Sequence, residues 1–579
     1  MGSRIGRFAP FAPYLVALAS GLLWGAAFGR EPWIVSAWLV LAPLVVLLGH
    51  PKAGRLAFLH GFAAWSFGLS WIPATLIGFG GLPKPVAILC LLILASYLAL
   101  FSFAFGRFGR RLWLRGGAWA FLGLPALWVA LEWLRAHLIG GFPWNLAAYA
   151  WVDVPGALPL SAWIGAYGIS FLVLFANVGI ALVWTNPLPP VPLSEGEGSQ
   201  AKASLPVPPS PSGRGAGGEG WFGTSLGTAR IRLVPLGLAL LVPLLLLGVA
   251  GRAGHRSVVA HHIARMEQGD FGRPVRIVQP NLPIRKDWDP AAAYADYRKA
   301  MDLAVESCEP GALVVLPESA LWPYSYERDP ALRRELAGLV ARGCSVVWNG
   351  QAEASETEIF NSAYLLAPTE PALTRYDKRR LVPFGEYIPF SPILGWVGRM
   401  ARGIGEYTPG REVKLLPWNA VPAPPGSLAA MLPPARDLLG MAICYEAVYP
   451  EEVAELSKAG ATLLATVTND AWYGDTAAPR QHLRAARFRA AENRKTLLRA
   501  ALTGISSLIA PDGSERQSVA LGTTGVIRAR VWGESGLTPY ARAPWLPPLL
   551  CSLGALFAII QLRPSRREKQ APESPDGSR

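Results

Sequence analysis

The stretch "LGMAICYEAVYPEEV", residues 439–453, sets a single cysteine between an apolar run and the start of a helix. The run 441–443 has the composition of a buried strand, and Pro450 followed by two glutamates is typical of a first helical turn. Cys444 is therefore expected at a corner between a strand and a helix. Because free cysteines are usually inert core residues, the stretch alone leaves two interpretations open, a packed thiol or a nucleophile.

The segments on both sides of this corner alternate between short apolar runs and helical patterns. Such alternation predicts a layered α/β fold. The predicted strands are 275–279, 312–318, 345–350, 362–368, 441–445 and 462–469, and the predicted helices are 292–307, 332–343, 450–460 and 479–495. Glu318, Cys444 and Asn469 fall at strand ends, where α/β sheets usually build their sites.

The rest of the chain is too apolar for a soluble protein. Of its 579 residues, 51% are hydrophobic and only 16% are charged, which is too few charges to cover several soluble domains. Apolar blocks near the ~20 residues that cross a bilayer predict eight membrane spans. These blocks are 10–29, 33–49, 56–78, 84–106, 117–137, 161–185, 231–250 and 544–562. The first is too soon followed by similar blocks to be a cleaved signal peptide.

Basic residues concentrate in every second short loop between these spans, which predicts that both termini are cytoplasmic and that the large polar segment faces outward. The net charge of +14 reflects these membrane boundaries, so we expect no nucleic-acid partner. The Pro-, Gly- and Ser-rich segment 186–229 is predicted to be a disordered cytoplasmic linker. The predicted units are a six-span bundle (1–185), this linker, a seventh helix (230–254), an outer domain (255–543), an eighth helix (544–562) and a cytoplasmic tail (563–579).

Two further segments carry groups that could act with Cys444. "VVLPESALWPY" runs from a strand into Glu318, and "RYDKRRLVPFGEYIPF" contains Lys378. Taken alone, Glu318 is typical of a solvated strand end, and the Lys378 segment is typical of a charged turn. Together they supply a base, a cation and a thiol, and the cation is expected to lower the pKa of the thiol. The base could take the thiol proton, while the lysine and the Tyr445 N–H could stabilise an oxyanion.

The order Glu318, Lys378, Cys444 resembles the Glu-Lys-Cys triad of the nitrilase superfamily, and the predicted spans with such an outer domain resemble bacterial apolipoprotein N-acyltransferase. The resemblance covers nearly the whole chain and implies an αββα nitrilase-like domain. Its motifs are "EWLRAHLIGGFPW" (132–144), "QPNLPIRKDWDP" (279–290), "PESAL" (317–321), "LVPFGEYIPF" (381–390), "ICYE" (443–446) and the run from "TNDAWYGD" to "LTGIS" (468–506).

Carried over residue by residue, the resemblance makes Cys444 the nucleophile, Glu318 the general base and Lys378 the group that stabilises charge. Glu386 would be a second carboxylate that positions Lys378. The remaining residues implied at the pocket are Trp288, Tyr445 and Glu446. The chain departs from the family pattern in its long linker, in Trp322 before a proline, and in the proline-rich stretch 417–437, where strand pairing is doubtful.

The resemblance implies a reaction as well. A fatty acyl chain would pass from a membrane phospholipid, through a thioester on Cys444, to the N-terminal amine of the diacylglyceryl-cysteine of an apolipoprotein, the last step of bacterial lipoprotein maturation. The enzyme would be a monomer in the bacterial inner membrane with its catalytic domain on the periplasmic side. The apolar segment 388–405 could be a membrane-dipping arm for these lipids or a loop packed on its own domain.

Two other functions stay open on the sequence. One is a membrane-tethered amidase of the nitrilase type that acts on a small carbon–nitrogen substrate. The other is a transporter or scaffold with a degenerate outer domain.

Several further residues have two interpretations. Cys308 and Cys344 could form a disulfide or stay free. Glu132 and Arg135 could be a helix-packing ion pair or bind substrate. Asn469 and Asp470 are expected to shape the pocket floor. The histidines show no metal-ligand spacing, so neither a metal nor another cofactor is expected.

Overall fold

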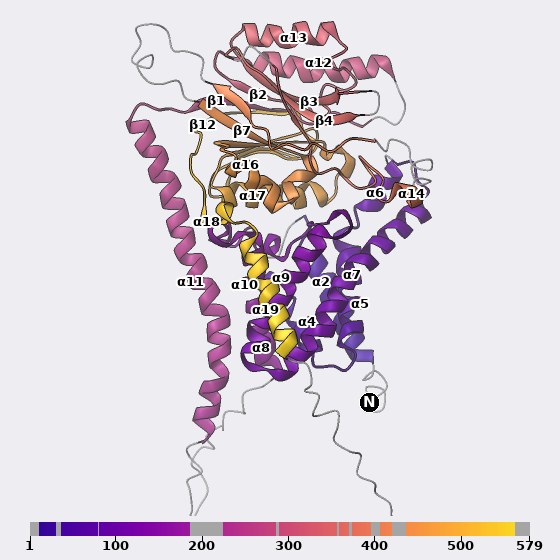
Figure 1. Ribbon diagram of the computed structural model, residues 1–579, viewed down its shortest axis with the longest axis vertical. Coiled ribbons are helices and arrows are strands. Elements are labelled where there is room, and N and C mark those ends of the chain that lie inside the picture. Colours follow the sequence, from indigo (N-terminus) through magenta and orange to yellow (C-terminus); the bar gives the residue numbers. More distant parts are fainter. Residues whose placement is uncertain are drawn as a thin grey trace, which may run out of the picture.

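The computed structural model describes residues 11–30, 36–78, 80–185, 224–284, 289–355, 358–369, 373–394, 406–419 and 436–561. The molecule consists of a bundle of helices and an α/β domain that lies against one end of the bundle (Figure 1). Most of the predicted linker, the cytoplasmic tail and the greater part of segments 388–405 and 417–437 lie outside the described residues.

The α/β domain contains two six-stranded sheets. The first has the order β12-β1-β2-β3-β4-β5 and the second the order β11-β10-β9-β8-β7-β6. The first consists of β1 (Arg273–Gln279), β2 (Leu313–Val315), β3 (Ser345–Glu353), β4 (Ile359–Leu366), β5 (Thr374–Asp377) and β12 (Gly525–Val531). The second consists of β6 (Leu416–Asn419), β7 (Arg436–Ile443), β8 (Leu463–Thr468), β9 (Leu497–Ala501), β10 (Ser506–Ile509) and β11 (Glu515–Val519).

The two sheets pack face to face with helices on both outer faces (Figure 1). Residues such as Val275, Leu313, Met441 and Val467 form the apolar layer between the sheets. Helices α12 (Pro290–Ser307) and α13 (Pro330–Ala341) cover the first sheet, and α16 (Pro450–Lys458) and α17 (Ala478–Asn493) cover the second. The predicted layered α/β fold is confirmed.

Parallel strands occupy the centre of each sheet, β1-β2-β3 in one and β7-β8-β9 in the other. The sequence patterns did not predict the parallel strand β9 or the antiparallel strands β5, β6, β10, β11 and β12. The doubtful pairing near the proline-rich stretch is present on its N-terminal side, where β6 pairs with β7 in antiparallel register. The carboxyl ends of β2, β7 and β8 carry the polar residues singled out above.

Every predicted span coincides with helical structure, but three are broken into two helices. The bundle contains α2 (Ala12–Ala26), α3 (Ser36–Leu39), α4 (Ala42–Leu47), α5 (Ala53–Gly68), α6 (Ile72–Gly78), α7 (Lys84–Arg115), α8 (Gly117–Phe121), α9 (Gly123–His137), α10 (Ala157–Thr185), α11 (Thr224–Glu267) and α19 (Leu546–Gln561). The break between α3 and α4 is stabilised by Asn177 of α10, whose Oδ1 accepts hydrogen bonds from the N–H groups of Leu41 and Ala42, both at 3.0 Å.

Four helical segments of the described chain are long and apolar enough to cross a membrane, namely Lys84–Arg115, Gly117–Gly140, Ala157–Thr185 and Gly237–Glu267. Helices α2 and α19 are apolar but shorter. The prediction of eight crossings therefore stays a prediction. Helix α11 begins inside the predicted linker and continues 13 residues past the predicted boundary at residue 254.

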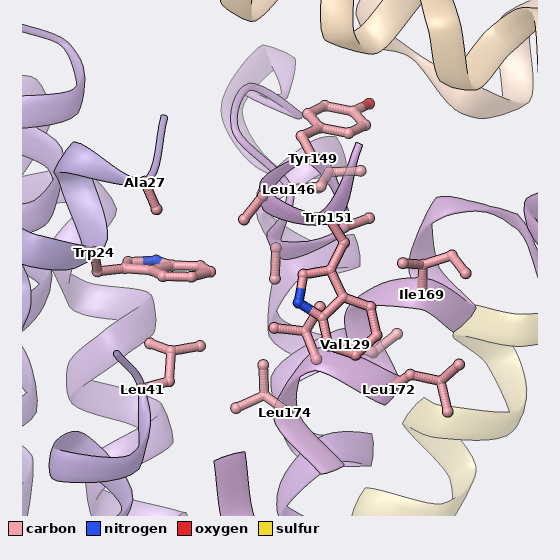
Figure 2. Packing of buried hydrophobic residues seen from close by; sticks show 14 of the residues in the cluster. Trp24, Ala27, Leu41, Val129, Leu146, Tyr149, Trp151, Ile169, Leu172 and Leu174 are labelled. Atoms are coloured by element: carbon pink, nitrogen blue, oxygen red, sulfur yellow. The ribbon is translucent and has the colours of Figure 1, made fainter. Parts of the chain in front are cut away.

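Aromatic side chains fill the bundle where its helices meet the short turn 147–151. Trp151 is fully buried and stacks on Trp38 with ring centroids 4.2 Å apart, close to Trp24 and Leu174 (Figure 2). The same apolar cluster continues into the α/β domain through Tyr445 of the 3₁₀ turn η5 (Cys444–Val448), Tyr449 directly after it and Phe488 of α17. The domain and the bundle thus share one hydrophobic core.

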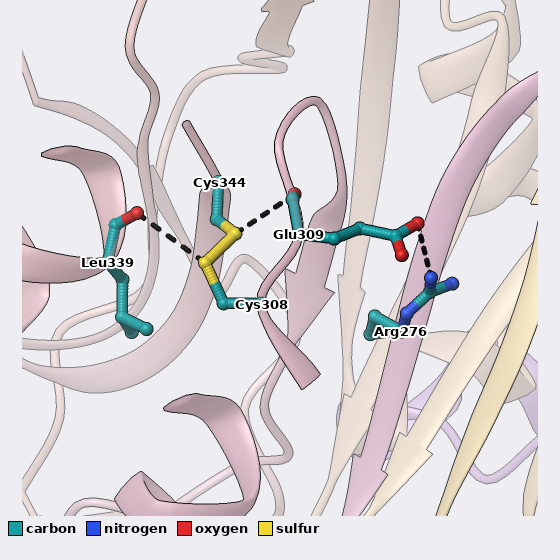
Figure 3. The surroundings of a disulfide bond; sticks show 5 residues. All are labelled: Arg276, Cys308, Glu309, Leu339 and Cys344. Atoms are coloured by element: carbon teal, nitrogen blue, oxygen red, sulfur yellow. Dashed lines mark hydrogen bonds and ion pairs between the residues drawn. A yellow bond between two sulfur atoms is a disulfide. The ribbon is translucent and has the colours of Figure 1, made fainter. Parts of the chain in front are cut away.

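Cys308 and Cys344 form a disulfide, which answers the question that the sequence left open (Figure 3). Cys308 follows α12 and Cys344 precedes β3, and their Cα atoms lie 5.8 Å apart. The bond ties the outer helical layer to the first sheet. Cys444 is the free cysteine of the described part of this domain.

Candidate active site

Cys444 lies at the corner predicted for it, after β7 and at the first position of the 3₁₀ turn η5 (Cys444–Val448). Its φ of +48° is in the left-handed region, which costs a non-glycine residue roughly 1–2 kcal/mol. Glu446 holds the corner, because its Oε2 accepts a hydrogen bond of 2.7 Å from the Ile443 N–H. The side chain of Cys444 is buried, with a residue exposure of 6%.

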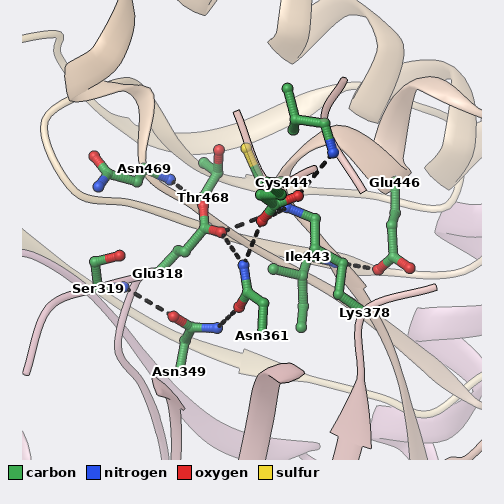
Figure 4. Close-up of polar contacts among 12 residues, drawn as sticks. Glu318, Ser319, Asn349, Asn361, Lys378, Ile443, Cys444, Glu446, Thr468 and Asn469 are labelled. Atoms are coloured by element: carbon green, nitrogen blue, oxygen red, sulfur yellow. Dashed lines mark hydrogen bonds and ion pairs between the residues drawn. The ribbon is translucent and has the colours of Figure 1, made fainter. Parts of the chain in front are cut away.

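Glu318 follows β2 and reaches toward the same point from the other sheet (Figure 4). Its Oε2 accepts a hydrogen bond of 2.8 Å from the Asn469 N–H, and its Oε1 accepts one of 2.9 Å from Nδ2 of Asn361. Oε1 also lies 3.6 Å from Nζ of Lys378. These contacts fix the carboxylate beside Cys444.

Lys378 follows β5, and its side chain is almost completely buried. Nζ donates a hydrogen bond of 2.8 Å to Oε1 of Glu386, whose Oε2 accepts one of 2.8 Å from the Val382 N–H. Burial alone would lower the pKa of Lys378, but Glu386, Glu318 and Cys444 raise it above its ordinary value. The ammonium therefore keeps its charge inside the protein.

Lys378 acts on the pKa of the thiol in the direction expected of the cation, but the net shift of that pKa has the opposite sign. Burial and the charge of Glu318 raise the pKa of Cys444 well above its ordinary value, and the opposing effect of Lys378 is smaller. The resting residue is therefore a neutral thiol. A thiol of this kind needs a base to remove its proton as it attacks, and Glu318 is the neighbouring carboxylate.

Asn361 and Asn349 are site residues that sequence reasoning missed. Nδ2 of Asn361 donates to both Glu318 and Glu386, the latter at 2.7 Å, so one amide holds two carboxylates. Nδ2 of Asn349 donates to Oδ1 of Asn361 at 2.6 Å, which orients that amide. Both lie on neighbouring strands β3 and β4, and no local motif distinguishes a strand asparagine of this kind.

The other residues that the resemblance placed at the pocket lie in different positions. Glu446 is buried and accepts hydrogen bonds from the hydroxyl of Tyr376 and the N–H groups of Arg379 and Arg380, so it joins the lysine segment to the cysteine corner. Burial raises the pKa of Glu446 to about 7, although these donors oppose the shift. Trp288 lies outside the described residues.

Tyr445 points to the bundle. Its hydroxyl donates a hydrogen bond of 3.3 Å to the Gly141 carbonyl, and its ring stacks on Trp144. The segment 141–144 therefore contacts the residue that follows Cys444. This contact places the site at the end of the α/β domain that faces the bundle.

Glu132 and Arg135 hold the same segment. Oε1 of Glu132 accepts a hydrogen bond of 2.8 Å from the Ala147 N–H, and Nη1 of Arg135 donates to the carbonyls of Phe142 and Trp144 at 2.6 and 2.8 Å. Both side chains are buried. Both side chains therefore hold this loop, and the choice between a helix-packing pair and substrate binding stays open.

The expected pocket-floor residues Asn469 and Asp470 make different contacts. The Asn469 N–H binds Glu318, whereas Asp470 is fully buried and forms an ion pair of 2.6 Å with Arg499. Burial would raise the pKa of Asp470, but Arg499 and His482 lower it to about 2. Among the described residues there is no group of three or more His, Cys, Asp and Glu side chains that could hold a metal ion.

The described chain thus combines a buried thiol, a carboxylate and an ammonium at the ends of three strands, which is an arrangement for nucleophilic acyl transfer. Residues 274–540 match the family of carbon-nitrogen hydrolases, and residues 20–179 match the apolipoprotein N-acyltransferase N-terminal domain. The α/β domain is therefore of the carbon-nitrogen hydrolase class, attached to a helical domain that occurs in acyltransferases.

Curated relatives match the chain over nearly its whole length. An apolipoprotein N-acyltransferase of Geobacter metallireducens is 30% identical over 96% of both chains. Those of Haemophilus ducreyi and Ralstonia nicotianae are 27% and 30% identical over 96% of this chain and 94% of their own. The chain belongs to the apolipoprotein N-acyltransferase family.

Proposed function

We propose that this protein transfers a fatty acyl chain from a membrane phospholipid to the N-terminal amine of the diacylglyceryl-cysteine of apolipoproteins. The observation that carries the proposal is the grouping of Cys444, Glu318 and Lys378 in one buried site beside the helical bundle. Both substrates are anchored in lipid, and each buried methylene contributes about 0.8 kcal/mol to that anchoring. A site at the bundle receives them without extracting them.

In the first half-reaction, Glu318 takes the proton of the Cys444 thiol while the sulfur attacks the carbonyl carbon of the phospholipid ester. The negative charge that develops on the carbonyl oxygen is stabilised by the Lys378 ammonium and the Tyr445 N–H. The ester C–O bond then breaks, and the proton on Glu318 passes to the lysophospholipid oxygen. The acyl chain stays on the sulfur as a thioester.

In the second half-reaction, the amine of the apolipoprotein attacks the thioester carbonyl. Glu318 takes a proton from the amine and returns one to the sulfur, so the free thiol is regenerated and an amide is formed. Glu386 and Asn361 position Lys378 and Glu318 through the contacts given above. Burial of the site keeps water from the thioester between the two steps.

The same proposal includes the topology. The protein is an inner-membrane enzyme with eight spans, six before residue 185, and with its α/β domain on the periplasmic side. The disulfide between Cys308 and Cys344 supports this side, because such bonds persist in oxidising compartments. The bound partners are the phospholipid donor and the lipid-modified acceptor, and the enzyme acts as a monomer.

Incubation of the purified full chain with phospholipid vesicles, followed by mass analysis of the Cys444 peptide, tests this function. We expect a gain of one fatty acyl group, lost when apolipoprotein is added and absent in Cys444→Ala. Glu318→Gln is expected to slow its appearance by at least 100-fold, within the range for loss of a general base. An unmodified wild-type peptide, with turnover of a small amide instead, would support an amidase and contradict the acyltransferase.

A further inference from the structure

The Cys444 carbonyl is held by a histidine that the mechanism above does not use. Nε2 of His482, on α17, lies 3.0 Å from this carbonyl oxygen. The histidine is fully buried. A carbonyl oxygen only accepts hydrogen bonds, so Nε2 carries the proton and donates it, whether the ring is neutral or charged.

The other side of the ring is fixed by a buried ion pair. Nδ1 of His482 lies 3.1 Å from Oδ1 of Asp470 and 3.3 Å from Nη2 of Arg499. Asp470 also accepts a hydrogen bond of 2.7 Å from the hydroxyl of Thr468, and all of these side chains are buried. The ring therefore has one orientation, with Nε2 toward the cysteine corner.

Packing leaves little room for the ring and its partners to move. The ring centroid of Trp144, from the bundle, lies 5.8 Å from that of His482. A methyl group added to Gly504 would come within 2.4 Å of Oδ2 of Asp470. The imidazole is thus packed against Trp144 of the bundle, and the carboxylate of Asp470 against the backbone at Gly504.

The direction of the carbonyl decides the direction of the next N–H. In a trans peptide the C=O of one residue and the N–H of the next lie in the peptide plane and point in opposite directions. The plane between Cys444 and Tyr445 is unusual because Cys444 has a positive φ. The Tyr445 N–H belongs to the first turn of η5, where backbone donors have no partner within the helix.

We propose that His482 is a positioning residue for acyl transfer: its hydrogen bond to the Cys444 carbonyl holds the following peptide so that the Tyr445 N–H points at the oxyanion. The role rests on the proposed thioester chemistry. His482 touches neither substrate nor sulfur. His482 acts on the oxyanion through the backbone of Cys444 and Tyr445. Asp470 and Arg499 contribute by holding the imidazole ring of His482 in place.

Two rates at Cys444, measured on the full chain in detergent, test this role. The first is formation of the acyl thioester from phosphatidylethanolamine–phosphatidylglycerol vesicles with labelled acyl chains, which needs the oxyanion donors. The second is alkylation by iodoacetamide, which forms no oxyanion. In His482→Leu we expect the first rate to fall about 10- to 100-fold, less than the 10²–10³ for outright loss of one donor. The alkylation rate is expected to stay within about threefold.

His482→Gln keeps a side-chain N–H₂ near the position of Nε2 and is expected to recover most of the acylation rate. Asp470→Asn is expected to show the same selective loss in weaker form, which keeps the test available where the leucine variant does not fold. His255→Leu, on the exposed side of α11, is the matched control for loss of an imidazole. Thermal unfolding of each variant reports folding separately.

The role is overturned when acylation and alkylation fall together, when the leucine variant acylates at the wild-type rate, or when glutamine is no better than leucine. Absence of any acyl thioester in the wild-type chain would instead contradict the proposed function. The two failures are therefore distinguishable.

Discussion

The Cys444 sulfur lies among groups that disfavour its anion. Burial, Glu318 and Asp470 raise the pKa of the thiol, and Lys378 and a hydrogen bond with Thr468 act in the other direction with smaller effect. A thiol kept neutral is protected from stray electrophiles until a substrate ester arrives. The carboxylate of Glu318 then removes the proton from the thiol, so deprotonation of the sulfur and its attack on the ester occur together.

The pH dependence of alkylation checks this state. Because the pKa of Cys444 is raised, its thiolate fraction at pH 8 is smaller than that of an ordinary cysteine, whose pKa is about 8.5. We expect the iodoacetamide rate to keep rising through pH 9 without a plateau. Glu318→Gln removes a negative charge and is expected to speed alkylation at pH 8 while it slows acylation. A wild-type plateau between pH 7 and 8 would show a lowered pKa instead.

A second residue-scale prediction concerns the shared amide of Asn361. Asn361→Leu removes the donor to the carboxylates of Glu318, which is buried, and Glu386, which is partly buried. A lost hydrogen bond to a charged group costs about 1.5–3 kcal/mol. We expect thioester formation to slow at least tenfold in the single-turnover assay. Gln351→Leu, on the neighbouring strand β3 and exposed, is the control and should acylate normally. Equal rates for the two variants would remove Asn361 from the site.

At this scale the sequence predicts some positions and misses others for a physical reason. Glu318 and Cys444 each follow an apolar run, so their polarity stands out from the local pattern. Lys378 follows the polar strand β5 and lies in a basic cluster, so the resemblance and not the local pattern singles it out. Asn361 lies within a strand and His482 within a helix, where a polar residue reads as an ordinary surface position. Their partners Glu318, Glu386 and Cys444 lie 43, 25 and 38 residues away along the chain.

At the scale of elements, α17 connects the two halves of the molecule. Oε1 of Gln481 accepts hydrogen bonds from the indoles of Trp71 and Trp144, at 3.2 and 2.7 Å. Its Nε2 donates to the carbonyls of Phe28 and Gly68, both at 3.0 Å. One side chain of the α/β domain therefore satisfies the ends of α2 and α5, next to the histidine that contacts the cysteine corner.

Gln481→Leu leaves these four groups, three of them on buried residues, without their partner. An unsatisfied buried group costs about 1–3 kcal/mol, so we expect the variant to lose at least about 3 kcal/mol of stability. Thermal unfolding of the full chain in detergent, followed by tryptophan fluorescence, measures this loss. Arg480→Leu changes the exposed neighbour on the same helix and should unfold within about 1 °C of wild type. Similar transitions for both variants would contradict the role of Gln481.

The broken helices are another feature in which the structure differs from what hydropathy predicts. Hydropathy treats 33–49 and 56–78 as single spans, yet each is two helices. Pro43 and Pro73 are near the start of the second helix in each case, and proline favours that position, so a signal was present. The acceptor that stabilises the first break, Asn177, comes from α10 and cannot be found from the local pattern.

At the scale of the whole molecule, the proposed topology separates exposed residues on opposite sides of a membrane. Glu358→Cys, beside β4, should react with an impermeant maleimide in right-side-out vesicles. Lys52→Cys, before α5, should react only in inverted vesicles. Both positions are exposed, and the parent chain controls for its own cysteines. The reverse labelling pattern would put the site in the cytoplasm and contradict the proposed function.

The α/β domain begins at β1 and closes at β12, and these two strands are antiparallel neighbours in full register from Arg273 with Val531 to Gln279 with Gly525. The chain therefore enters the domain from α11 and leaves it toward α19 at two adjacent points. A domain whose two ends are adjacent can be inserted between two helices in one genetic event, without a change in the path of either helix. The helical bundle and the α/β domain could thus have evolved as separate proteins before they were joined in one chain and acquired complementary surfaces.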